Sequence, residues 1–432
     1  MYIDKITLTN IRGFSTLEFS LARKDGAHAG WTVFTGDNGS GKSTLLKAVA
    51  IALTGRDTAR ALQPSFSGWV KDNSASQGTI ELSLLHDDSA DEFSPSGRTP
   101  QRAFQAKITL VREGKDTFLE GVGAGASNSK KSAAQRGPWS TTARGWFACG
   151  YGPFRRVFGA SPEATRLMVS PMTERFVTMF EEAASLFEVD LWLRSLSHKK
   201  LEGKTEEGEQ LDLMVELLRD DLLPNEITVD HVDSDGLWLR DRNNLKLSWS
   251  EMSDGYRAAL ALLTDIIRHL ITAYGINGLL ARNESGKLYV TRPGVVMIDE
   301  IDAHLHPDWQ QKIGFWLKEH FPRIQFLVTT HSPLICQAAD DNGIFVLPAP
   351  GANDEARKLT DEEYNRVIVS RPDTILLTPA FGLKNTRSPL AVASRAEYSK
   401  LQAKKRAGVN LSPDESQRIE QLKLFAETNE EI

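Results

Sequence analysis

Apolar and polar residues alternate along the opening segment of the chain, which is the period of a strand with one buried face. The alternation runs over residues 6–8 and again over 17–19, on either side of the segment 11–14. It therefore predicts two strands joined by a tight turn. A mostly apolar run at 31–35 predicts a third, buried strand, and the apolar segment 45–53 then predicts a helix.

The periodicity of strands and that of helices recur along the rest of the chain. In order, they predict strands over 79–86 and 106–112, helices over 173–200 and 207–222, strands over 226–249, and alternating helices and strands from 250 to about 347. The tail from about residue 390 is charged and helical. Ser412 precedes a proline there, with Glu415 three positions on, which is the start signal of a new helix. The tail therefore predicts a helical hairpin.

Residues 121–144 show no apolar periodicity and are rich in glycine and serine. Lys130, Lys131 and Arg136 make this segment basic. A mobile basic loop and a loop that contacts nucleic acid both fit this composition. The segment 144–156 that follows predicts a buried strand that ends in a turn.

The composition narrows the class of protein. The chain has 432 residues, of which 41% are hydrophobic and 25% charged, as in an ordinary globular protein with two or three subregions. No apolar stretch approaches the roughly 20 residues that span a bilayer, and the N-terminus enters a strand pattern directly. We expect neither a membrane segment nor a signal peptide. Two cysteines fit a reducing compartment, so we expect a cytoplasmic protein.

The net charge of −6 bears on the partners of the chain. A protein that holds DNA by itself usually carries a strong basic surplus. Any nucleic-acid contact of this chain therefore needs a local basic patch or a partner chain.

Residues 36–44 read Gly-Asp-Asn-Gly-Ser-Gly-Lys-Ser-Thr and lie between the predicted strand 31–35 and the predicted helix 45–53. In this context the motif is typical of a loop that cradles the phosphates of ATP. Its glycines let backbone N–H groups face phosphate, and the helix N-terminus adds its dipole. Lys42 would reach the β- and γ-phosphates, and Ser43 would place its hydroxyl on Mg²⁺. The residues predicted to bind ATP in this phosphate loop are Gly36, Asn38, Gly39, Gly41, Lys42, Ser43 and Thr44.

A second apolar strand, predicted over 294–298, ends in Asp299 and Glu300. In this class of fold we expect such a strand to lie beside the phosphate-loop strand. Asp299 would then bind Mg²⁺ through water, and Glu300 would orient or deprotonate the attacking water. The plainer alternative is a buried strand that ends in two solvated acids.

The segment 324–333 predicts another buried strand, which delivers His331 to the same sheet edge. A histidine there can hydrogen-bond the γ-phosphate and report its loss. A purely structural histidine is the alternative. The predicted catalytic residues are therefore Lys42, Glu300 and His331, and the predicted metal ligands are Ser43 and Asp299.

The segment 247–257 leads into an amphipathic helix with Ser253 at its N-cap. Gly255 permits close approach, and the free N–H groups of the helix start point outward. These residues form a second anion site, separate from the phosphate loop. One chain cannot easily place both sites on one ATP, whereas two chains arranged head to tail can. We therefore expect a head-to-tail homodimer.

Residues 252–256, Met-Ser-Asp-Gly-Tyr, resemble the signature motif of ABC-type ATPases and are called the signature segment below. Together with the phosphate loop, the acids at Asp299 and the position of His331, their order and spacing resemble the SMC, RecF and OLD branch of that superfamily. The resemblance covers about residues 1–55 and 247–347. It implies an α/β fold, with an ABC-type (P-loop) ATPase head built on a mixed sheet, a helical insertion and a C-terminal helical hairpin.

Two shorter segments extend this resemblance. The segment 11–14 is similar to the adenine-side turn of the branch, which implies nucleotide contacts for Arg12 and Phe14. The segment 298–307 closely resembles the OLD-like subgroup, in which its His-Leu-His stretch occupies the D-loop position.

The resemblance also implies contacts across a dimer. The signature segment of one subunit would touch the γ-phosphate held by Lys42 of the other. His304 and His306, at the D-loop position, would contact the partner subunit. A metal pair with His331 is the alternative, although this ATPase core needs no transition metal.

Three departures from the branch bear on function. The long heptad arms of SMC proteins are absent, as is the run of acids with which a Toprim nuclease holds two Mg²⁺ ions. No glutamine stands at 150–155, where the Q-loop glutamine of the family is expected. The chain is therefore expected to be neither a chromosome-tethering rod nor a nuclease by itself.

A narrower resemblance rests on the segments 151–155, 190–193 and 377–389. They are similar to ATPases of bacterial anti-phage defence systems of the Septu type, including retron-linked ones. Those ATPases pair with a separate HNH nuclease, which implies a nuclease subunit of HNH type as a partner of this chain. The C-terminal hairpin is then a docking surface for the partner, or it packs on its own domain.

The leading hypothesis is a Mg²⁺-dependent ATP hydrolase whose ATP-sandwich dimer regulates a partner nuclease in an anti-phage defence complex. The alternative is a stand-alone, RecF-like DNA-repair ATPase. It requires a basic face formed by Lys130, Lys131, Arg136, Arg155, Arg156, Lys199 and Lys200. A third hypothesis is an ATP-gated scaffold that barely hydrolyses, against which the presence of Glu300 argues.

The predicted domains follow from these segments. Residues 1–120 form a nucleotide-binding lobe, and 121–246 form an insertion of helices and strands with the basic loop. Residues 247–347 carry the signature segment, the two acids and His331. Residues 348–432 form a helical region that could dock a partner.

Overall fold

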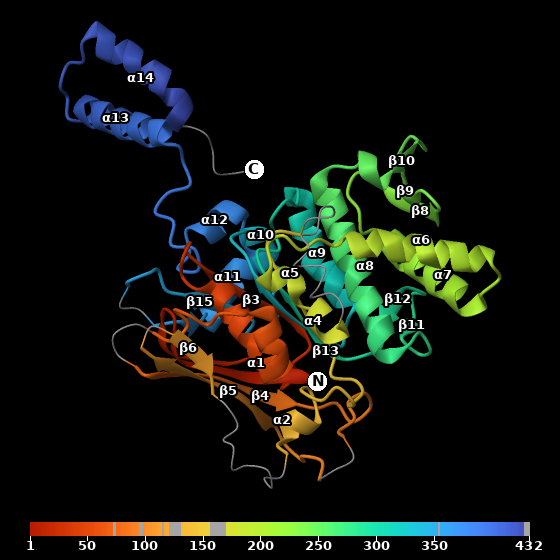
Figure 1. The fold of residues 1–432 in the computed structure, drawn as a ribbon. Coiled ribbons are helices and arrows are strands. Elements are labelled where there is room, and N and C mark those ends of the chain that lie inside the picture. Colours follow the sequence, from red (N-terminus) through yellow and green to blue (C-terminus); the bar gives the residue numbers. More distant parts are fainter. Residues whose placement is uncertain are drawn as a thin grey trace. The chain divides into compact units, whose positions relative to one another are not determined.

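The strands predicted at the start of the chain form an antiparallel sheet (Figure 1). The computed structural model describes residues 1–71, 75–94, 98–114, 116–120, 131–155, 170–352 and 355–426. These residues divide into two units, Met1–Ile375 and Leu376–Ile432, each with its own hydrophobic core.

The antiparallel sheet has the strand order β2-β1-β4-β5-β6. Its strands are β1 (Tyr2–Ile11), β2 (Phe14–Ser20), β4 (Gln77–Leu85), β5 (Phe104–Glu113) and β6 (Asp116–Leu119). β1 pairs with β2 so that Ile11 opposes Phe14, which confirms the predicted hairpin. Ile6 and Leu8 of β1 are fully buried, whereas Thr7 between them is partly exposed, as the alternation in the sequence indicates.

A second sheet has the order β16-β15-β3-β14-β13-β7. Its strands are β3 (Gly30–Gly36), β7 (Ala148–Tyr151), β13 (Gly294–Ile298), β14 (Ile324–Thr329), β15 (Ile344–Leu347) and β16 (Arg357–Lys358). Five of them run parallel, and β16 is antiparallel to β15. The α/β class is therefore confirmed.

The order of this parallel sheet corrects one prediction. We expected β13, which ends next to Asp299, to lie beside the phosphate-loop strand β3. Instead β14 pairs with both strands and separates them. Every residue of β14 is buried, and a strand covered on both faces occupies the middle of a parallel sheet.

Helix α1 (Lys42–Leu62) lies between the two sheets. It contacts β4 and β5 of the antiparallel sheet as well as β3, β14 and β7 of the parallel sheet. Leu45, Leu46 and Val49 are fully buried because the helix is covered on several sides. The helix bends at Gly55, whose φ is 77°. The helix that follows the phosphate loop is thus held in place by the hydrophobic core.

Further helices of the described residues precede Leu377. They are α2 (Ala133–Arg136), α4 (Pro171–Glu174), α5 (Val177–Phe180), α6 (Phe187–Leu201), α7 (Thr205–Arg219), the 3-10 turn η1 (Trp249–Glu251), α8 (Asp254–Tyr274), α9 (Pro307–His320), α10 (Pro333–Cys336), α11 (Asp361–Val369) and α12 (Pro372–Leu376). Two small antiparallel sheets accompany them, formed by β8 (Thr228–Asp233), β9 (Gly236–Arg240) and β10 (Lys246–Ser248), and by β11 (Leu280–Arg282) and β12 (Leu288–Val290).

Two predictions about the insertion are wrong in part. The continuous helix predicted over 173–200 is broken into α4, α5 and α6. Part of the segment 121–144, predicted to be a loop, forms α2, where Ser132 and Gln135 make a capping box. Residues 121–130 of that segment lie outside the described residues.

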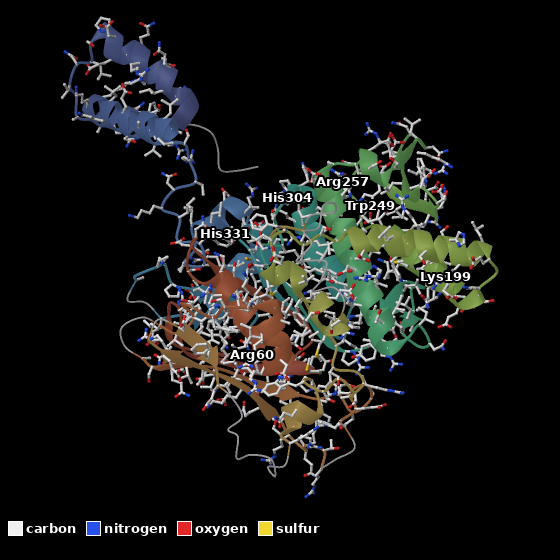
Figure 2. The ribbon with its side chains drawn as sticks, viewed as in Figure 1. Arg60, Lys199, Trp249, Arg257, His304 and His331 are labelled. Carbon is white, nitrogen blue, oxygen red and sulfur yellow. The ribbon has the colours of Figure 1, made fainter. Side chains whose placement is uncertain are left out.

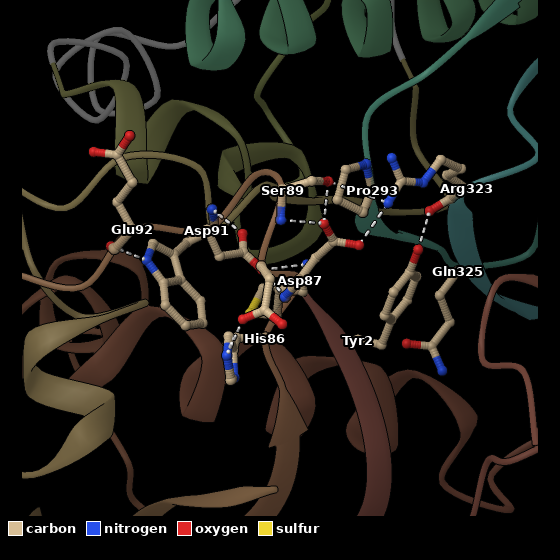
Figure 3. Close-up of polar contacts among 12 residues, drawn as sticks. Tyr2, His86, Asp87, Ser89, Asp91, Glu92, Pro293, Arg323 and Gln325 are labelled. Atoms are coloured by element: carbon tan, nitrogen blue, oxygen red, sulfur yellow. Dashed lines mark hydrogen bonds and ion pairs between the residues drawn. The ribbon is translucent and has the colours of Figure 1, made fainter. Parts of the chain in front are cut away.

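Gln325 of β14 joins the two sheets and lies beside Tyr2 in Figure 3, which draws the contacts of Tyr2 and Asp87 with Arg323. Its buried side chain accepts from the backbone N of Ile3 at 2.7 Å and donates to the backbone O of Ile3 at 2.8 Å. Beside it, the hydroxyl of Tyr2 donates to the backbone O of Arg323 at 3.1 Å. The guanidinium of Arg323 pairs with Asp87 at 2.6 Å. β1 is thereby fixed to the strand that leads to His331.

The second unit contains the predicted helical hairpin, formed by α13 (Pro389–Arg406) and α14 (Pro413–Ala426). Leu401, Ile419 and Leu422 are buried between the two helices. Ion pairs at 2.8–2.9 Å, Lys404 with Glu415 and Arg418 with Glu397, also link them. Throughout the described part of the chain, no helix combines the length and the apolar character that crossing a bilayer requires.

Replacing Gln325 with leucine should destabilise the first unit. The substitution leaves the buried N–H and C=O of Ile3 without partners, at a cost of about 2–4 kcal/mol in the free energy of unfolding. Chemical denaturation followed by tryptophan fluorescence measures this loss. As a control, the Gln77→Leu variant changes an exposed strand glutamine and should stay within about 0.5 kcal/mol of the wild type. Equal stability of both variants would show that Gln325 does not join the sheets.

Candidate nucleotide-binding site

The carboxyl ends of the parallel strands meet at one edge of the sheet, and the predicted site residues follow them. Ile298 at the end of β13 pairs with Val328 of β14 on one side and with Tyr151 at the end of β7 on the other. On the far side of β14, Thr329 pairs with Phe34 of β3. In Figure 2 the labelled His331, which follows β14, and His304, which follows β13, lie on the upper side of the sheet.

The phosphate loop follows β3 at this edge and depends on three glycines with positive φ. The φ angles are 148° at Gly36, 81° at Gly39 and 98° at Gly41. A Cβ on Gly36 would lie 2.5 Å from the backbone O of Leu347, and one on Gly41 would lie 2.6 Å from the ring of Phe14. Only glycine fits these places, and the loop can therefore turn its N–H groups toward an anion.

Lys42 begins α1 and is buried at this loop, with 6% of its surface exposed. Its Nζ donates to the backbone O of Gly36 at 2.8 Å and to that of Asp37 at 3.0 Å. Burial lowers the pKa of Lys42, and the carboxylates of Glu300 and Asp299 oppose this shift. The first turn of α1 contains no acid, so the positive end of its dipole is not neutralised within the helix.

Arg12, which was predicted to contact the nucleotide, lies over the start of α1. Its φ is 46°, and its Nη1 donates to the hydroxyl of Thr44 at 3.2 Å. The guanidinium stacks over the ring of Trp69, with 4.5 Å between Cζ and the ring centre. Phe14 is buried against Gly41. The turn 11–14 therefore contributes to the wall of the phosphate loop.

Thr329 was not predicted as a site residue, yet it organises the two acids. Its hydroxyl donates to Asp299 Oδ1 at 2.5 Å and accepts from the backbone N of Glu300 at 2.7 Å. Asp299 is 1% exposed, whereas Glu300 is only partly buried. The signal in the sequence is the pair of threonines directly before His331, which end an otherwise apolar strand.

His331 follows this strand and has a buried polar atom without a partner. Its Nε2 makes no hydrogen bond within the part of the chain that the structure describes. The neighbouring side chains are fixed, because Thr330 donates to Asp302 at 2.5 Å and Ser332 donates to Gln310 at 2.6 Å. A buried ring nitrogen without a partner is costly unless a ligand group satisfies it.

The signature segment lies against the turn that follows the two acids. A Cβ on Gly255 would lie 2.3 Å from the backbone O of His304, so the start of α8 touches this turn within one chain. Ser253 stands at the N-cap of α8, is exposed, and does not use its side chain to cap the helix. Ser253 is thus open to solvent at the start of α8.

A metal site formed by histidines is not supported. Searching the described residues finds no group of three or more His, Cys, Asp or Glu side chains that could hold a metal ion. His306 instead caps α9, where its Nδ1 accepts from the backbone N of Asp308 at 3.3 Å.

Only some of the described candidates for a basic DNA-binding face are exposed, Lys131 among them. Arg136 and Arg155 are buried, with 7% and 5% of their surfaces exposed. Lys199 pairs with Glu207, and Lys200 pairs with Asp212. Two further candidates, Lys130 and Arg156, lie outside the described residues.

The residues of this edge fit a nucleoside triphosphate with Mg²⁺. The glycines of the loop take backbone conformations that bring it close to Leu347 and Phe14, and a buried lysine supplies the charge. Within the described residues the buried Nε2 of His331 and the hydroxyl of Ser40 have no hydrogen-bond partner, and each can donate to a phosphate oxygen when it carries a proton. Ser43 and Asp299 carry oxygen atoms of the kind that Mg²⁺ prefers as ligands.

Comparison with known proteins places most of the chain in one family. Residues 31–337 match the family described as "AAA domain, putative AbiEii toxin, Type IV TA system". The chain is similar to the Septu protein PtuA of Bacillus mycoides (strain KBAB4), with 24% identity over 420 residues, which cover 97% of this chain and 49% of that protein.

Two further proteins are similar to this chain over different shares of its length. The Retron Ec83 probable ATPase of Escherichia coli is 46% identical over 107 residues, which cover 25% of this chain and 18% of that protein. The chain thus spans about half or less of the length of these two relatives. The crystal structure of the SmcHead bound to the C-winged helix domain of ScpA aligns with 85% of this chain and 100% of that chain, at 17% identity and a TM-score of 0.49.

The Lys42→Ala variant should lose ATP binding. It removes the buried cation of the phosphate loop, and the loss of charge-assisted hydrogen bonds should weaken binding by about 100-fold or more. Titration with a fluorescent ATP analogue measures the dissociation constant. The Lys24→Ala variant removes a surface lysine paired with Asp361 and should bind like the wild type. Unchanged affinity of Lys42→Ala would show that this loop is not the nucleotide site.

Proposed function

The chain belongs to the AAA domain family described as putative AbiEii toxin, Type IV TA system, and from this we propose that it is a Mg²⁺-dependent ATP hydrolase. In the full proposal, two chains form an ATP-sandwich dimer that regulates a partner nuclease in an anti-phage defence complex. The observation that carries the proposal is the buried Lys42 in the glycine loop after β3, at the edge of the sheet where Asp299 and Glu300 follow β13. A cation for phosphate and two acids for metal and water are the minimum set for phosphoryl transfer to water.

Each residue of the edge has a separate role in this proposal. Lys42 and the N–H groups of the phosphate loop bind the phosphates of the substrate ATP. Ser43 and Asp299 hold Mg²⁺, which neutralises the charge that develops on the phosphoryl oxygens. Glu300 orients or deprotonates the attacking water, and His331 donates to the γ-phosphate through Nε2 and reports its cleavage.

The dimer follows from the position of the signature segment. Ser253 is exposed at the start of α8, and its side chain makes no capping bond there. We place it, with Gly255, on the γ-phosphate that is bound by a second copy of the chain. The D-loop residue His304, whose backbone touches Gly255, would then lie at the dimer interface.

The regulatory part of the proposal rests on resemblance and on charge. The relatives named Septu protein PtuA and Retron Ec83 probable ATPase support a defence-system role. Searching the described residues finds no metal-binding cluster that a nuclease would need. The net charge of −6 also makes a DNA-binding role for the chain alone unfavourable. A separate nuclease, for which an HNH type is the expectation, would supply the cleavage.

Glu300→Gln should trap the ATP-bound dimer. The amide cannot take a proton from water, and loss of a general base should lower the rate of ATP hydrolysis by about 100-fold or more. Phosphate release measures the rate, and light scattering with ATP and Mg²⁺ should give the mass of a dimer. Glu319→Gln, a change in the last turn of α9, should hydrolyse ATP like the wild type. Wild-type hydrolysis by Glu300→Gln would refute the catalytic assignment.

The partner is tested by native mass spectrometry of the chain purified after expression from its own operon, with ATP and without it. A stable complex with a second, nuclease-sized chain is the expected result, and its mass gives the stoichiometry. A homodimer without another chain would contradict the regulatory part while leaving the ATPase part intact. Salt-sensitive DNA binding by that homodimer would then favour the repair ATPase.

A further inference from the structure

Arg155 lies at the carboxyl edge of the sheet, four residues after the end of β7. β7 pairs in parallel with β13, and Tyr151 opposes Ile298, so Arg155 and the acids after Ile298 leave the sheet at the same level. The side chain is 5% exposed. Basic residues so deeply buried are rare unless their donors are satisfied.

The guanidinium of Arg155 binds backbone oxygens of the turn 299–303. Nη1 donates to the O of Asp299 at 2.8 Å, and Nη2 donates to the O of Glu300 at 3.0 Å. Nη2 also lies 3.3 Å from the O of Ala303 and 3.4 Å from that of Ile301. Nη1 further donates to Gly152 of its own strand connection at 3.1 Å. One side chain thus holds four carbonyls of a five-residue turn, which the planar fork of an arginine allows and a lysine does not.

This turn needs such support because its backbone is strained. Glu300 has a φ of 47° and His304 a φ of 68°, both in the left-handed region that side chains other than glycine disfavour. Strained residues persist only where their surroundings fix them. Thr329 fixes the N–H side of the turn, because its hydroxyl accepts from Glu300 and its backbone O accepts from Ile301 at 3.1 Å. Arg155 fixes the carbonyl side.

The guanidinium of Arg155 donates to backbone carbonyls rather than to carboxylates. Among the described residues Arg155 makes no ion pair within 4 Å of an acid, although Asp299, Asp302 and Glu300 are near enough to influence it. The carboxylates of Asp299 and Glu300 therefore remain available to a metal ion and to water. At the same time the positive charge stabilises three acids gathered in one turn.

We infer that Arg155 is the positioning residue of this site, which sets the backbone of the turn 299–304 so that Glu300 faces its water and His304 meets the signature segment. The inference rests on the proposed ATPase function for its kinetic consequence. Its structural part, the fixing of the turn, does not depend on ATP.

A second contact links the strand before Arg155 to the signature helix. The hydroxyl of Tyr151 donates to the buried Asp265 of α8 at 2.9 Å. Asp265 in turn accepts from Arg268 at 2.8 Å. The end of β7 therefore contacts α8 through Tyr151 and the acidic turn through Arg155. The two halves of the proposed ATP site in one chain share this strand as a common support.

The structural part is tested by hydrogen–deuterium exchange of the chain without nucleotide. In Arg155→Ala, amides of the segment 299–305 should exchange roughly tenfold faster or more, because the turn opens once its carbonyls lose their donor. Arg155→Lys keeps the charge with fewer donors and should give an intermediate rate. The control Arg323→Ala removes a carbonyl-binding arginine at the opposite end of β14 and should leave this segment unchanged. Wild-type exchange of the segment in folded Arg155→Ala would overturn the inference.

Measurements of kcat and KM distinguish a positioning role of Arg155 from a general structural role. Arg155→Ala should lower kcat for ATP by about 10-fold or more and leave KM within about twofold, because the phosphate loop is intact. Millimolar guanidinium should restore part of kcat in Arg155→Ala and have no such effect on Arg323→Ala. If Arg155→Ala fails to fold, Arg155→Lys carries the same test, with a smaller loss of kcat at unchanged KM. Equal losses in both arginine variants, without rescue, would overturn the inference.

The outcomes also separate this inference from the ATPase proposal. A wild-type chain that hydrolyses no ATP refutes the proposed function, and the exchange experiment still decides whether Arg155 fixes the turn. An active wild type with unchanged kcat in Arg155→Ala leaves the ATPase proposal standing and refutes the positioning role.

Discussion

Asp299 and Glu300 follow β13 directly, and the backbone has to reverse there, with Glu300 in the left-handed region, before it reaches His304. The N–H groups of this turn are fixed by Thr329 and its carbonyls by Arg155, so the two neighbouring strands of β13 hold it from opposite sides. The parallel register makes this possible, because β14 and β7 end level with β13. Asp299 and Glu300 lie beyond the last residue of β13, so that strand alone does not orient them. The site therefore depends on the contacts with Thr329 and Arg155 on its two sides.

The same turn connects the two surfaces that a dimer would use. It begins at the acids that act on Lys42 and ends at His304, whose carbonyl touches Gly255 at the start of α8. A shift of the turn would therefore move Glu300 and the signature segment together. If two chains close on ATP, contact at the signature segment of one chain bears directly on Glu300 of that same chain. Such a rigid link is a physical route for coupling the two ATP sites of a dimer.

Local patterns predicted the parts of the site that are contiguous in sequence. The glycines of the phosphate loop, the acids after an apolar strand and the helical hairpin each carry a signal within a few residues. The order of the parallel strands has no such signal. β13 and β14 are both uniformly buried, and only tertiary packing decides that β14 lies next to β3. The strand order was therefore predicted wrongly, although both strands were found.

Arg155 shows most clearly what local sequence patterns do not predict. A basic residue in a glycine-containing segment suggests a solvated charge that contacts nucleic acid. Its burial depends on β7 pairing with β13, which places five backbone oxygens around it. An arginine used in this way cannot reach a phosphate of DNA, and neither can Arg136, which donates to the backbone O of Arg98. The lysines at 199 and 200 are paired with acids. Arg136 and Arg155 are therefore not part of a basic surface for DNA, in a chain whose net charge is −6.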